Sequence, residues 1–374
     1  MPTARAASVD VLVVTVVHNP DDARILHRQI RALLDAGHRV VYAAPFSGYR
    51  TTPWPQVHAV DVPRARGRRR LRALLGARRV LREHGPRADL VLLHDPELLL
   101  AAATVRLSVP IVWDVHEDTG AALSLKPWMP SAVRPLVRRC VGLAERVAER
   151  RGRLLLAETG YAERFSRQHP VVPNSVLVPT ADPAPPGDER VVYVGALSHA
   201  RGAADMVALG QRLKPRGIRV QLVGTADSST ELLLRDAVRA GHVEWLGFRP
   251  NDVARASLDG ALAGLSLLHD EPNYAHSQPT KILEYMAHGI PVVTTPNASS
   301  VRLVQRHACG HVVPFEDPGA AAAAVLALHA DPDRRVRLGL NGRRGAQSDY
   351  DWRLEGPRFA ALLESWALGE TVRG

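Results

Sequence analysis

Hydrophobic residues along the chain form two alternating patterns. Short runs that are almost entirely apolar and rich in valine, such as residues 10–16, are typical of parallel strands buried on both faces. Between these runs, apolar residues recur every three or four positions, which indicates amphipathic helices. In the first half of the chain, this reading predicts strands at 10–16, 39–43, 57–62, 89–93, 109–113, 154–157 and 171–172.

The segments between these strands predict helices. The first covers residues 23–36, with Asp21 or Asp22 as its N-cap and Gly37 as its stop. The second covers residues 64–82 and is strongly basic. Strands that alternate with helices over short connections define an α/β fold with a doubly wound parallel sheet. The remaining helices of this half are predicted at 98–105, 132–150 and 162–168.

A proline-rich polar stretch, residues 174–190, then interrupts the alternation and is typical of a linker. We therefore predict a first domain over 1–173, a linker over 174–190, a second domain over 191–350, and a helical segment over 351–374 that packs back on the first domain. The strands of the second half are predicted at 191–194, 219–223, 243–246, 261–268, 292–293 and 311–314. Its helices are predicted at 203–213, 229–240, 252–257, 300–306, 318–329, 332–346 and 352–367.

Residues 277–295 predict a loop, a short helix and a strand. Pro279 suits the first helical position, because its missing N–H costs nothing there. Gly289 suits a left-handed C-cap, and Pro291 then prevents the helix from continuing. The side chains of this helix that we expect to face the core are Ile282, Leu283 and Met286.

The start of this helix has the composition of an anion site. The backbone N–H groups near Ser277 to Thr280 would point at one place, Lys281 adds a positive charge, and Glu284 follows one turn later. A cation beside a carboxylate suits a ligand that carries both phosphates and a diol, such as a nucleotide with its ribose. The alternative is an ordinary amphipathic helix with an incidental Lys–Glu pair, and this stretch alone leaves both open.

Polar residues follow three strands of the first half, at the sheet edge where α/β proteins bind ligands. Many such residues are ordinary caps, but three strands that each end in histidine and aspartate favour a site. The candidates are His18, Asn19, Asp21, His94, Asp95, His116, Glu117 and Asp118.

Composition supports two globular domains. The chain has 374 residues, of which 46% are hydrophobic and 23% charged, and no apolar run approaches the length of a membrane span. Its N-terminal residues lack the apolar region of a signal peptide. Cys140 and Cys309 lie far apart without metal-ligand spacing. We therefore expect a cytoplasmic protein without a zinc site.

The net charge of +10 is concentrated in residues 64–82, which contain nine arginines. Leu71, Leu74, Leu75 and Val80 form an apolar stripe in this segment. A basic amphipathic helix can lie on anionic lipid at the inner membrane face, guide an anionic substrate, or simply be solvated. Nucleic acid is disfavoured as a partner, because the segment has no aromatic residues for base stacking.

Several motifs together resemble retaining glycosyltransferases of family 4. Residues 279–292, PTKILEYMAHGIPV, resemble the donor-binding helix of that family, and residues 193–202, YVGALSHARG, resemble the loop that opens its second domain. Residues 18–25, 94–98 and 114–118 are similar to signatures of its first domain. The resemblance implies the GT-B fold: two Rossmann-like, doubly wound parallel-sheet domains facing each other across a cleft, the first binding the acceptor and the second the nucleotide-sugar donor.

The resemblance also implies roles for individual residues. Glu284 matches the glutamate that holds the donor ribose, Arg201 and Lys281 match contacts to the diphosphate, and His116 matches a histidine near the reacting centre. The remaining donor-side candidates are Gly195, Gly224, His276, Ser277, Gln278, Pro279 and Thr280.

Two departures from the family pattern affect the donor side. The family has a glutamate where this chain has His276, and many members have an arginine where it has Ala196. The missing carboxylate normally holds hexose hydroxyls. These departures keep two alternatives open: a catalytically impaired member that binds a sugar nucleotide or a protein, and an epimerase or hydrolase that acts on nucleotide sugars.

The implied reaction is transfer of a hexosyl group from a UDP- or GDP-sugar to a hydroxyl of a small-molecule, glycan or lipid-linked acceptor, with retention of anomeric configuration. Such acceptors belong to bacterial natural products or to cell-envelope glycans. The chain has no Asp-x-Asp metal motif in a fitting context. We therefore expect neither a metal nor another cofactor, and no nucleic-acid partner.

Overall fold

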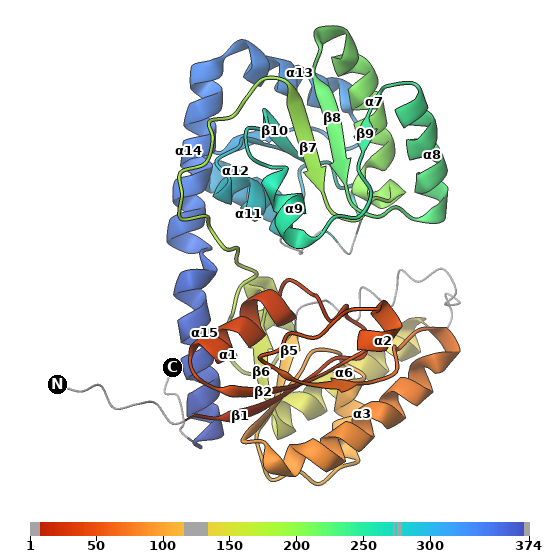
Figure 1. Cartoon of the computed structure of the whole chain (residues 1–374), viewed down its shortest axis with the longest axis vertical. Helices are drawn as coiled ribbons and strands as arrows, with labels where there is room; N and C mark the ends of the chain where they lie inside the picture. The colour runs from red at the N-terminus through yellow and green to blue at the C-terminus, as the bar shows by residue number, and fades with distance from the viewer. Residues whose placement is uncertain (1–7, 116–133, 272–273, 275–278, 370–374) are drawn as a thin grey trace, which may run out of the picture. The chain divides into compact units, whose positions relative to one another are not determined.

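The computed structural model describes the chain except residues 1–7, 116–133, 272–273, 275–278 and 370–374 (Figure 1). The chain divides into two compact units. The first unit contains Met1–Pro173 and Arg353–Gly374, and the second contains Asn174–Trp352. The first unit is therefore built from two separate stretches of sequence.

The first unit contains a six-stranded parallel sheet with strand order β3-β2-β1-β4-β5-β6. Buried valine and leucine side chains fill both faces of its central strands, as the continuous apolar runs predict. The strands are β1 (Asp10–Val14), β2 (Arg39–Ala44), β3 (His58–Asp61), β4 (Leu90–Leu93), β5 (Ile111–Val115) and β6 (Arg153–Leu156). The α-helices before the second unit are α1 (Arg31–Asp35), α2 (Phe46–Tyr49), α3 (Arg70–His84), α4 (Leu98–Ala103) and α6 (Arg134–Arg151).

Some predicted elements of the first unit differ from the structure. The helix predicted over 23–36 is a π-helical segment, Ile25–Ile30, followed by α1. The Asp22 carboxylate caps this segment by accepting hydrogen bonds from the backbone N–H groups of Arg24 and Ile25. The basic helix begins at Arg70 rather than at residue 64. In place of the helix predicted over residues 162–168, the structure has the 3₁₀ turns of Thr159–Arg164.

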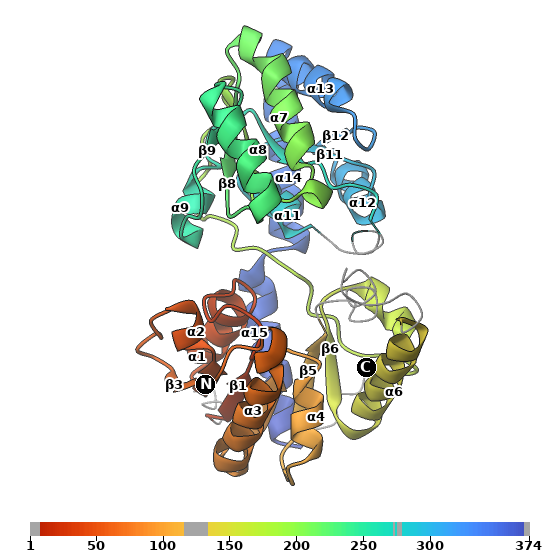
Figure 2. The ribbon, with the colours of Figure 1, turned by 90° about the vertical axis from the view of Figure 1, so that its right-hand side faces the viewer.

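The second unit contains another six-stranded parallel sheet, with order β12-β11-β10-β7-β8-β9. One core joins α7, α8 and α13 to one face of the sheet, and another joins α11, α12 and α14 to the other face (Figure 2). The strands are β7 (Arg190–Val194), β8 (Arg219–Val223), β9 (Glu244–Trp245), β10 (Ala263–Ser266), β11 (Val292–Thr294) and β12 (Gly310–Val312). The helices are α7 (Ala203–Leu213), α8 (Ser228–Arg239), α9 (Asn251–Ala256), α11 (Thr280–Ala287), α12 (Ala298–His307), α13 (Pro318–Ala330) and α14 (Pro332–Asp349).

The proline-rich segment 174–190 is packed on the second unit. Val176 and Val178 are buried in its core, and the backbone of Val176 is hydrogen-bonded to Tyr350 and Trp352. The buried guanidinium of Arg343 donates to the carbonyls of Pro179 and Ala181. Because these contacts fix much of its backbone, the segment is an ordered part of this unit.

The last helix, α15 (Trp352–Ala367), returns the chain to the first unit. Its side chains Phe359, Leu363 and Trp366 are buried. The Arg153 guanidinium lies 5.2 Å from the centroid of the Trp366 ring. The α15 residues therefore contribute to the core of the first unit.

Candidate active site

Each sheet has a point at which the strand order reverses, and ligands of doubly wound folds bind outside the carboxyl ends of the strands there. The reversal lies between β1 and β4 in the first unit and between β7 and β10 in the second. His18 and Asp95 follow β1 and β4. Gly195 follows β7. The sequence-predicted residues are therefore found at both reversal points.

Helix α11 carries the donor-side candidates Thr280, Lys281 and Glu284. Its buried face includes Ile282, Leu283 and Met286, as predicted, and Gly289 adopts a left-handed φ of 66° just after the helix. Pro279 was predicted at the first helical position, but it is the N-cap, with φ −72° and ψ 103°. The helix therefore starts one residue later than expected.

Tyr285 fixes α11 over the strand reversal of the second unit. Its hydroxyl donates to the carbonyl of Leu265 at 2.9 Å and accepts from the backbone N–H of Val194 at 3.3 Å. A Cβ added at Gly264 would lie 2.3 Å from the Tyr285 ring, so only glycine lets the ring lie against β10. Because Leu265 belongs to β10 and Val194 to β7, the Tyr285 side chain holds α11 to both strands.

Two glycines bring the loops after β7 and β8 together. Gly195 and Gly224 both have a φ of 144°, which side-chain-bearing residues rarely adopt. The backbone N–H of Gly195 donates to the carbonyl of Val223 at 2.9 Å. A Cβ at Gly224 would lie 1.9 Å from the carbonyl oxygen of Gly195. The close approach leaves a bare backbone beside Lys281, whose Cε would lie 3.5 Å from a Cβ at Gly195.

Lys281 occupies an environment that disfavours its charge. Its Nζ lies 4.9 Å from the centroid of the Tyr193 ring. Burial, with a further contribution from the positive charge of Arg201, lowers the pKa of Lys281 to about 7. The Tyr193 hydroxyl donates to the carbonyl of Ala196 at 2.6 Å, and burial raises the pKa of Tyr193 to about 12. Lys281 and Arg201 thus lie near each other, and over the described part of the chain no carboxylate forms an ion pair with either.

Arg201 lies in the turn between β7 and α7. Its guanidinium carbon is 6.0 Å from the centroid of the Tyr274 ring. Burial acts to lower the pKa of Arg201, but interactions with the hydroxyls of Tyr193 and Tyr274 outweigh it, and the pKa is raised. Arg201 therefore stays charged while Lys281 titrates near neutrality.

Glu284 lies one turn after Lys281 on α11. Its Oε2 is 3.6 Å from Nε of Arg255, a residue of α9, and 18% of its side chain is exposed. Part of the Glu284 side chain is therefore exposed, although its Oε2 atom is buried beside Arg255. The second unit brings together Gly195, Gly224, Arg201, Lys281 and Glu284.

Sequence reasoning missed a histidine network beside this group. His269, which follows β10, has its Nε2 2.7 Å from the Asp205 carboxylate and its Nδ1 3.2 Å from Glu316. Its backbone N–H donates to the carbonyl of Ala200, and its ring meets the edge of the His199 ring at 4.9 Å. The network connects the β10 loop to the turn that carries Arg201. No spacing in the sequence relates these residues, because they come together only across the sheet.

In the first unit, Asp95 organises the loop after β1. Its Oδ2 accepts hydrogen bonds from the Thr15 hydroxyl at 2.9 Å and from the backbone N–H groups of Val16 at 2.5 Å and Val17 at 3.2 Å. Its Oδ1 lies 3.3 Å from Nε2 of His18. The Asp95 side chain is 1% exposed and that of His18 is 21% exposed. His18 is therefore the accessible member of the pair, and Asp95 orients it.

Asn19 and Asp21 shape the turn that follows. The Asn19 side-chain carbonyl accepts from the backbone N–H of Asp21 at 3.1 Å, and the Asp21 carboxylate lies 2.7 Å from Nε2 of His27. Both residues are partly exposed. Their contacts hold the turn that follows His18 in a defined conformation.

His94 occupies a buried network rather than the surface. Its Nδ1 lies 3.4 Å from the carboxylate of Asp114, and both side chains are fully buried. Asp114 accepts two hydrogen bonds from the Arg24 guanidinium, at 2.8 and 2.7 Å, and one from the Gln29 amide at 2.8 Å. A fully buried side chain is not positioned to contact an acceptor, so the structure assigns His94 to this core network.

Six predicted site residues lie outside the described residues. They are His116, Glu117, Asp118, His276, Ser277 and Gln278. Within the part of the chain that is described, no group of three or more His, Cys, Asp or Glu side chains is arranged to hold a metal ion. Over that same part, no helix has the length and apolarity needed to cross a bilayer.

Comparison with known families identifies the class. The model described as Glycosyltransferase Family 4 matches residues 23–180, and the model described as Glycosyl transferases group 1 matches residues 188–331. Together with the two parallel sheets, these matches define a glycosyltransferase-type protein. The chain belongs to the family 4, group 1 type of glycosyltransferases.

Two relatives show how far the sequence similarity extends. The chain is 26% identical over 350 residues to the phosphatidyl-myo-inositol mannosyltransferase of Mycolicibacterium smegmatis, a match that covers 89% of this chain and 87% of the relative. It is 25% identical over 185 residues to the amylovoran biosynthesis glycosyltransferase AmsK of Erwinia amylovora, covering 48% and 45%. The match therefore spans most of the mannosyltransferase but less than half the length of AmsK.

Solved structures confirm the GT-B fold. The sucrose-phosphate synthase of Thermosynechococcus elongatus matches 97% of this chain with a TM-score of 0.76 and 18% identity, and all of that chain is covered. The Anabaena protein Alr3699/HepE, solved with UDP-glucose, matches 96% with a TM-score of 0.70 and 15% identity, also over its whole length. At these identities the similarity establishes the fold alone.

Proposed function

We propose that the protein transfers a hexosyl group from a nucleoside diphosphate sugar to a hydroxyl of an acceptor. The observation that carries this proposal is the pairing of Arg201 with Lys281, whose pKa is lowered to about 7, at the strand reversal of the second unit. Two neighbouring cations repel each other, and a dianion that binds between them removes this repulsion. A diphosphate supplies that charge.

The remaining donor groups fit a nucleotide. Glu284 offers a carboxylate for the ribose hydroxyls, and the bare backbone at Gly195 lets phosphate oxygens approach closely. HepE was solved with UDP-glucose, a ligand of the proposed class. We assign donor binding to the second unit and acceptor binding to the first, where Asp95 orients His18.

The proposed reaction needs stabilisation of the leaving group. The bond between the anomeric carbon and the phosphate oxygen breaks, a bond forms between that carbon and the acceptor oxygen, and the acceptor proton passes to the departing phosphate. Arg201 and Lys281 would stabilise the negative charge on the diphosphate as it develops. The proposal includes retention of configuration. It also includes independence from metal ions, because these two cations can stabilise the charge of the diphosphate, as a metal ion does in other enzymes.

The test is calorimetric titration with UDP, GDP, ADP and CMP, followed by the sugar conjugates of whichever nucleotide binds, with and without EDTA. We expect one nucleoside diphosphate to bind with micromolar affinity in both conditions. Lys281→Ala should weaken binding about tenfold or more, since hydrogen bonds to charged groups contribute about 1.5–3 kcal/mol. Lys214→Ala is the matched control, because Lys214 lies in the same unit and its Nζ donates only to the carbonyl of Ala240 among the described contacts.

Turnover is measured separately from binding. Release of the nucleotide from its sugar conjugate only when an acceptor is present supports the transferase, whereas release without an acceptor indicates a hydrolase. Binding without any turnover would favour the non-catalytic alternative that His276 raised. Absence of binding to every nucleotide would overturn the proposed donor site.

A further inference from the structure

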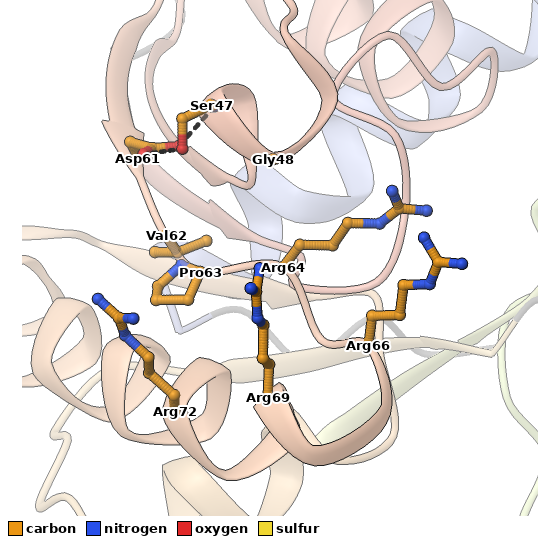
Figure 3. Close-up of a pocket in the computed structure, with 9 residues that line it drawn as sticks. All are labelled: Ser47, Gly48, Asp61, Val62, Pro63, Arg64, Arg66, Arg69 and Arg72. Atoms are coloured by element: carbon orange, nitrogen blue, oxygen red, sulfur yellow. Dashed lines mark hydrogen bonds between the residues drawn. The ribbon is translucent and has the colours of Figure 1, made fainter.

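A pocket of about 680 Å³ lies in the first unit. The side chains of Arg64 and Arg66 extend from the loop after β3. Arg69 ends the 3₁₀ turn before α3, and Arg72 lies in the first turn of α3 (Figure 3). The other residues that line it are Ser47, Gly48, Asp61, Val62 and Pro63.

The charges around the pocket are unbalanced. Among the described residues, four arginines line it and one carboxylate, that of Asp61. This carboxylate accepts hydrogen bonds from the backbone N–H of Ser47 at 2.9 Å and from the Ser47 hydroxyl at 2.6 Å. Over the described residues, no carboxylate forms an ion pair with any of the four arginines. By contrast, Arg70 and Arg79 on the same helix pair with Glu97 and Glu83.

The local fold keeps these arginines together at some cost. Gly76 lets α3 pack against Pro63, because an added Cβ would lie 2.8 Å from the proline ring, and Gly48 leaves room for Arg64. The first turn of α3 has no acidic residue and no side-chain cap. Positive side chains at the positive end of a helix are electrostatically unfavourable. A bound anion would relieve this repulsion.

The pocket is connected to the loop that carries His18. The backbone N–H of Ala65 donates to the carbonyl of Val16 at 2.8 Å, and the Tyr49 hydroxyl donates to the carbonyl of Val17 at 2.7 Å. The Arg64 guanidinium stacks 3.7 Å from the centroid of the Tyr49 ring. Two of the pocket's supporting residues are therefore anchored directly to the acceptor-side loop.

We propose that this pocket binds a phosphate-type anion carried by the acceptor. The inference rests on the proposed function, since it names the acceptor class: a hydroxyl compound that also bears a phosphate monoester or diester. A planar guanidinium group can donate two parallel hydrogen bonds to the oxygens of one phosphate. A pocket lined by four guanidinium groups is therefore suited to a phosphate. The aromatic ring of Tyr49, beside the pocket, is already covered by Arg64, which disfavours base stacking and therefore nucleic acid as the ligand.

The first experiment titrates inorganic phosphate, followed by ³¹P NMR at low salt. The Arg201→Ala/Lys281→Ala variant is the background, so that the proposed donor site no longer contributes. We expect phosphate binding to persist there and to weaken about tenfold or more when Arg69→Ala and Arg72→Ala are added, since two charge-assisted contacts are lost. Arg82→Ala/Arg87→Ala is the matched control: it removes two exposed arginines that do not line the pocket and should change the affinity less than twofold.

The results separate this inference from the proposed function. Equal weakening by both arginine pairs, or no phosphate binding in the background variant, would overturn the pocket. Titration of the Arg69→Ala/Arg72→Ala variant with the nucleoside diphosphate should give the wild-type affinity. If no nucleotide binds the wild-type protein while phosphate still binds the pocket, the donor proposal fails and the anion site remains.

A second experiment identifies the source of the phosphate. Vesicles of phosphatidylcholine, with and without phosphatidylglycerol, are sedimented with the protein. Leu71 and Leu75 lie next to the pocket arginines on α3 and are 67% and 58% exposed. If the phosphate is a lipid headgroup, binding to the anionic vesicles should fall with Arg69→Ala/Arg72→Ala and also with Leu71→Ser/Leu75→Ser, which should leave inorganic phosphate binding unchanged. Vesicle binding without inorganic phosphate binding would contradict the pocket as the site.

Discussion

Single residues set the electrostatics of both units. Burial and the charge of Arg201 lower the pKa of Lys281 to about 7. In the first unit, Arg24 stays charged because the Asp114 carboxylate accepts two hydrogen bonds from its guanidinium. Burial disfavours the charged form of both side chains. A neighbouring carboxylate offsets this effect at Arg24 but not at Lys281. An uncompensated buried cation indicates a ligand site, whereas a paired one indicates structure.

The lowered pKa of Lys281 predicts proton uptake on donor binding. At pH 8 a lysine with a pKa of about 7 is mostly neutral, and a bound diphosphate raises the pKa by favouring the ammonium form. We expect uptake of close to one proton per site, measured as the dependence of the calorimetric binding enthalpy on the ionisation enthalpy of the buffer. Lys281→Met should abolish the uptake. Equal uptake by this variant would show that another group takes the proton.

The Asp114 pair predicts a large stability effect. Asp114→Ala leaves the buried Arg24 charge without its carboxylate, so we expect a loss of about 3–5 kcal/mol in unfolding free energy. The matched change is Asp10→Ala, which removes the partly exposed carboxylate paired with the exposed Arg39 and should cost much less. Urea unfolding of the two variants measures the difference. Similar losses would mean that burial does not strengthen the Arg24 pair.

Elements are positioned in this protein by close backbone contacts as well as by apolar burial. Helix α11 lies over β7 and β10 because Tyr285 bonds to both strands and Gly264 leaves space for its ring. The loops after β7 and β8 meet at Gly195 and Gly224. These contacts place the N-terminus of α11 and the cation pair at the strand reversal.

The contact between the two loops predicts a strong effect of Gly224→Ala. The added Cβ would lie 1.9 Å from the Gly195 carbonyl oxygen, and the φ of 144° is itself strained for alanine. We expect a loss of nucleotide affinity of about tenfold, since the loops must separate beside Lys281. Gly217→Ala is the control: its φ of 71° is also positive, but nothing lies within 4 Å of the added Cβ. It should cost about 1–2 kcal/mol of stability and leave affinity unchanged.

At the scale of the whole molecule, the first unit depends on both ends of the chain. Residues from Arg353 onwards belong to it, and Phe359, Leu363 and Trp366 are buried there. The second unit is a single continuous segment. The stability of the first unit is therefore sensitive to changes far from its main stretch of sequence.

This arrangement predicts where a substitution in α15 acts. Trp366→Ala should cost about 3–5 kcal/mol, because it removes a large buried side chain. Hydrogen exchange followed by mass spectrometry should show faster exchange in β1, β2 and β6 and unchanged exchange in the sheet of the second unit. Leu354→Ala, at a position of α15 that is 51% exposed, is the control and should change neither. Faster exchange confined to the second unit would contradict the assignment of α15 to the first.

The sequence predicted both parallel sheets, whereas the contacts of the individual site residues could be described only from the structure. Apolar runs identify strands, and a helix start with Lys281 and Glu284 at adjacent turns is visible locally. The burial of His94 could not be predicted, because the sequence position after a strand does not reveal whether the side chain turns inward. The π-helical turns at Ile25–Ile30 and the late start of α3 depend on contacts between distant segments, such as Ala65 with Val16. Such contacts have no signature in local spacing.

The split composition of the first unit also orders events during synthesis on the ribosome. Its sheet strands emerge first, yet the residues that complete its core, Phe359 to Trp366, are translated after the whole of the second unit. The second unit is contiguous, so it can complete its core before the first one does. The early apolar strands must then remain incompletely covered for the time needed to translate roughly 180 residues, an interval of about 10–40 seconds at roughly 5–20 residues per second. Chaperone protection of nascent chains is most valuable over that interval.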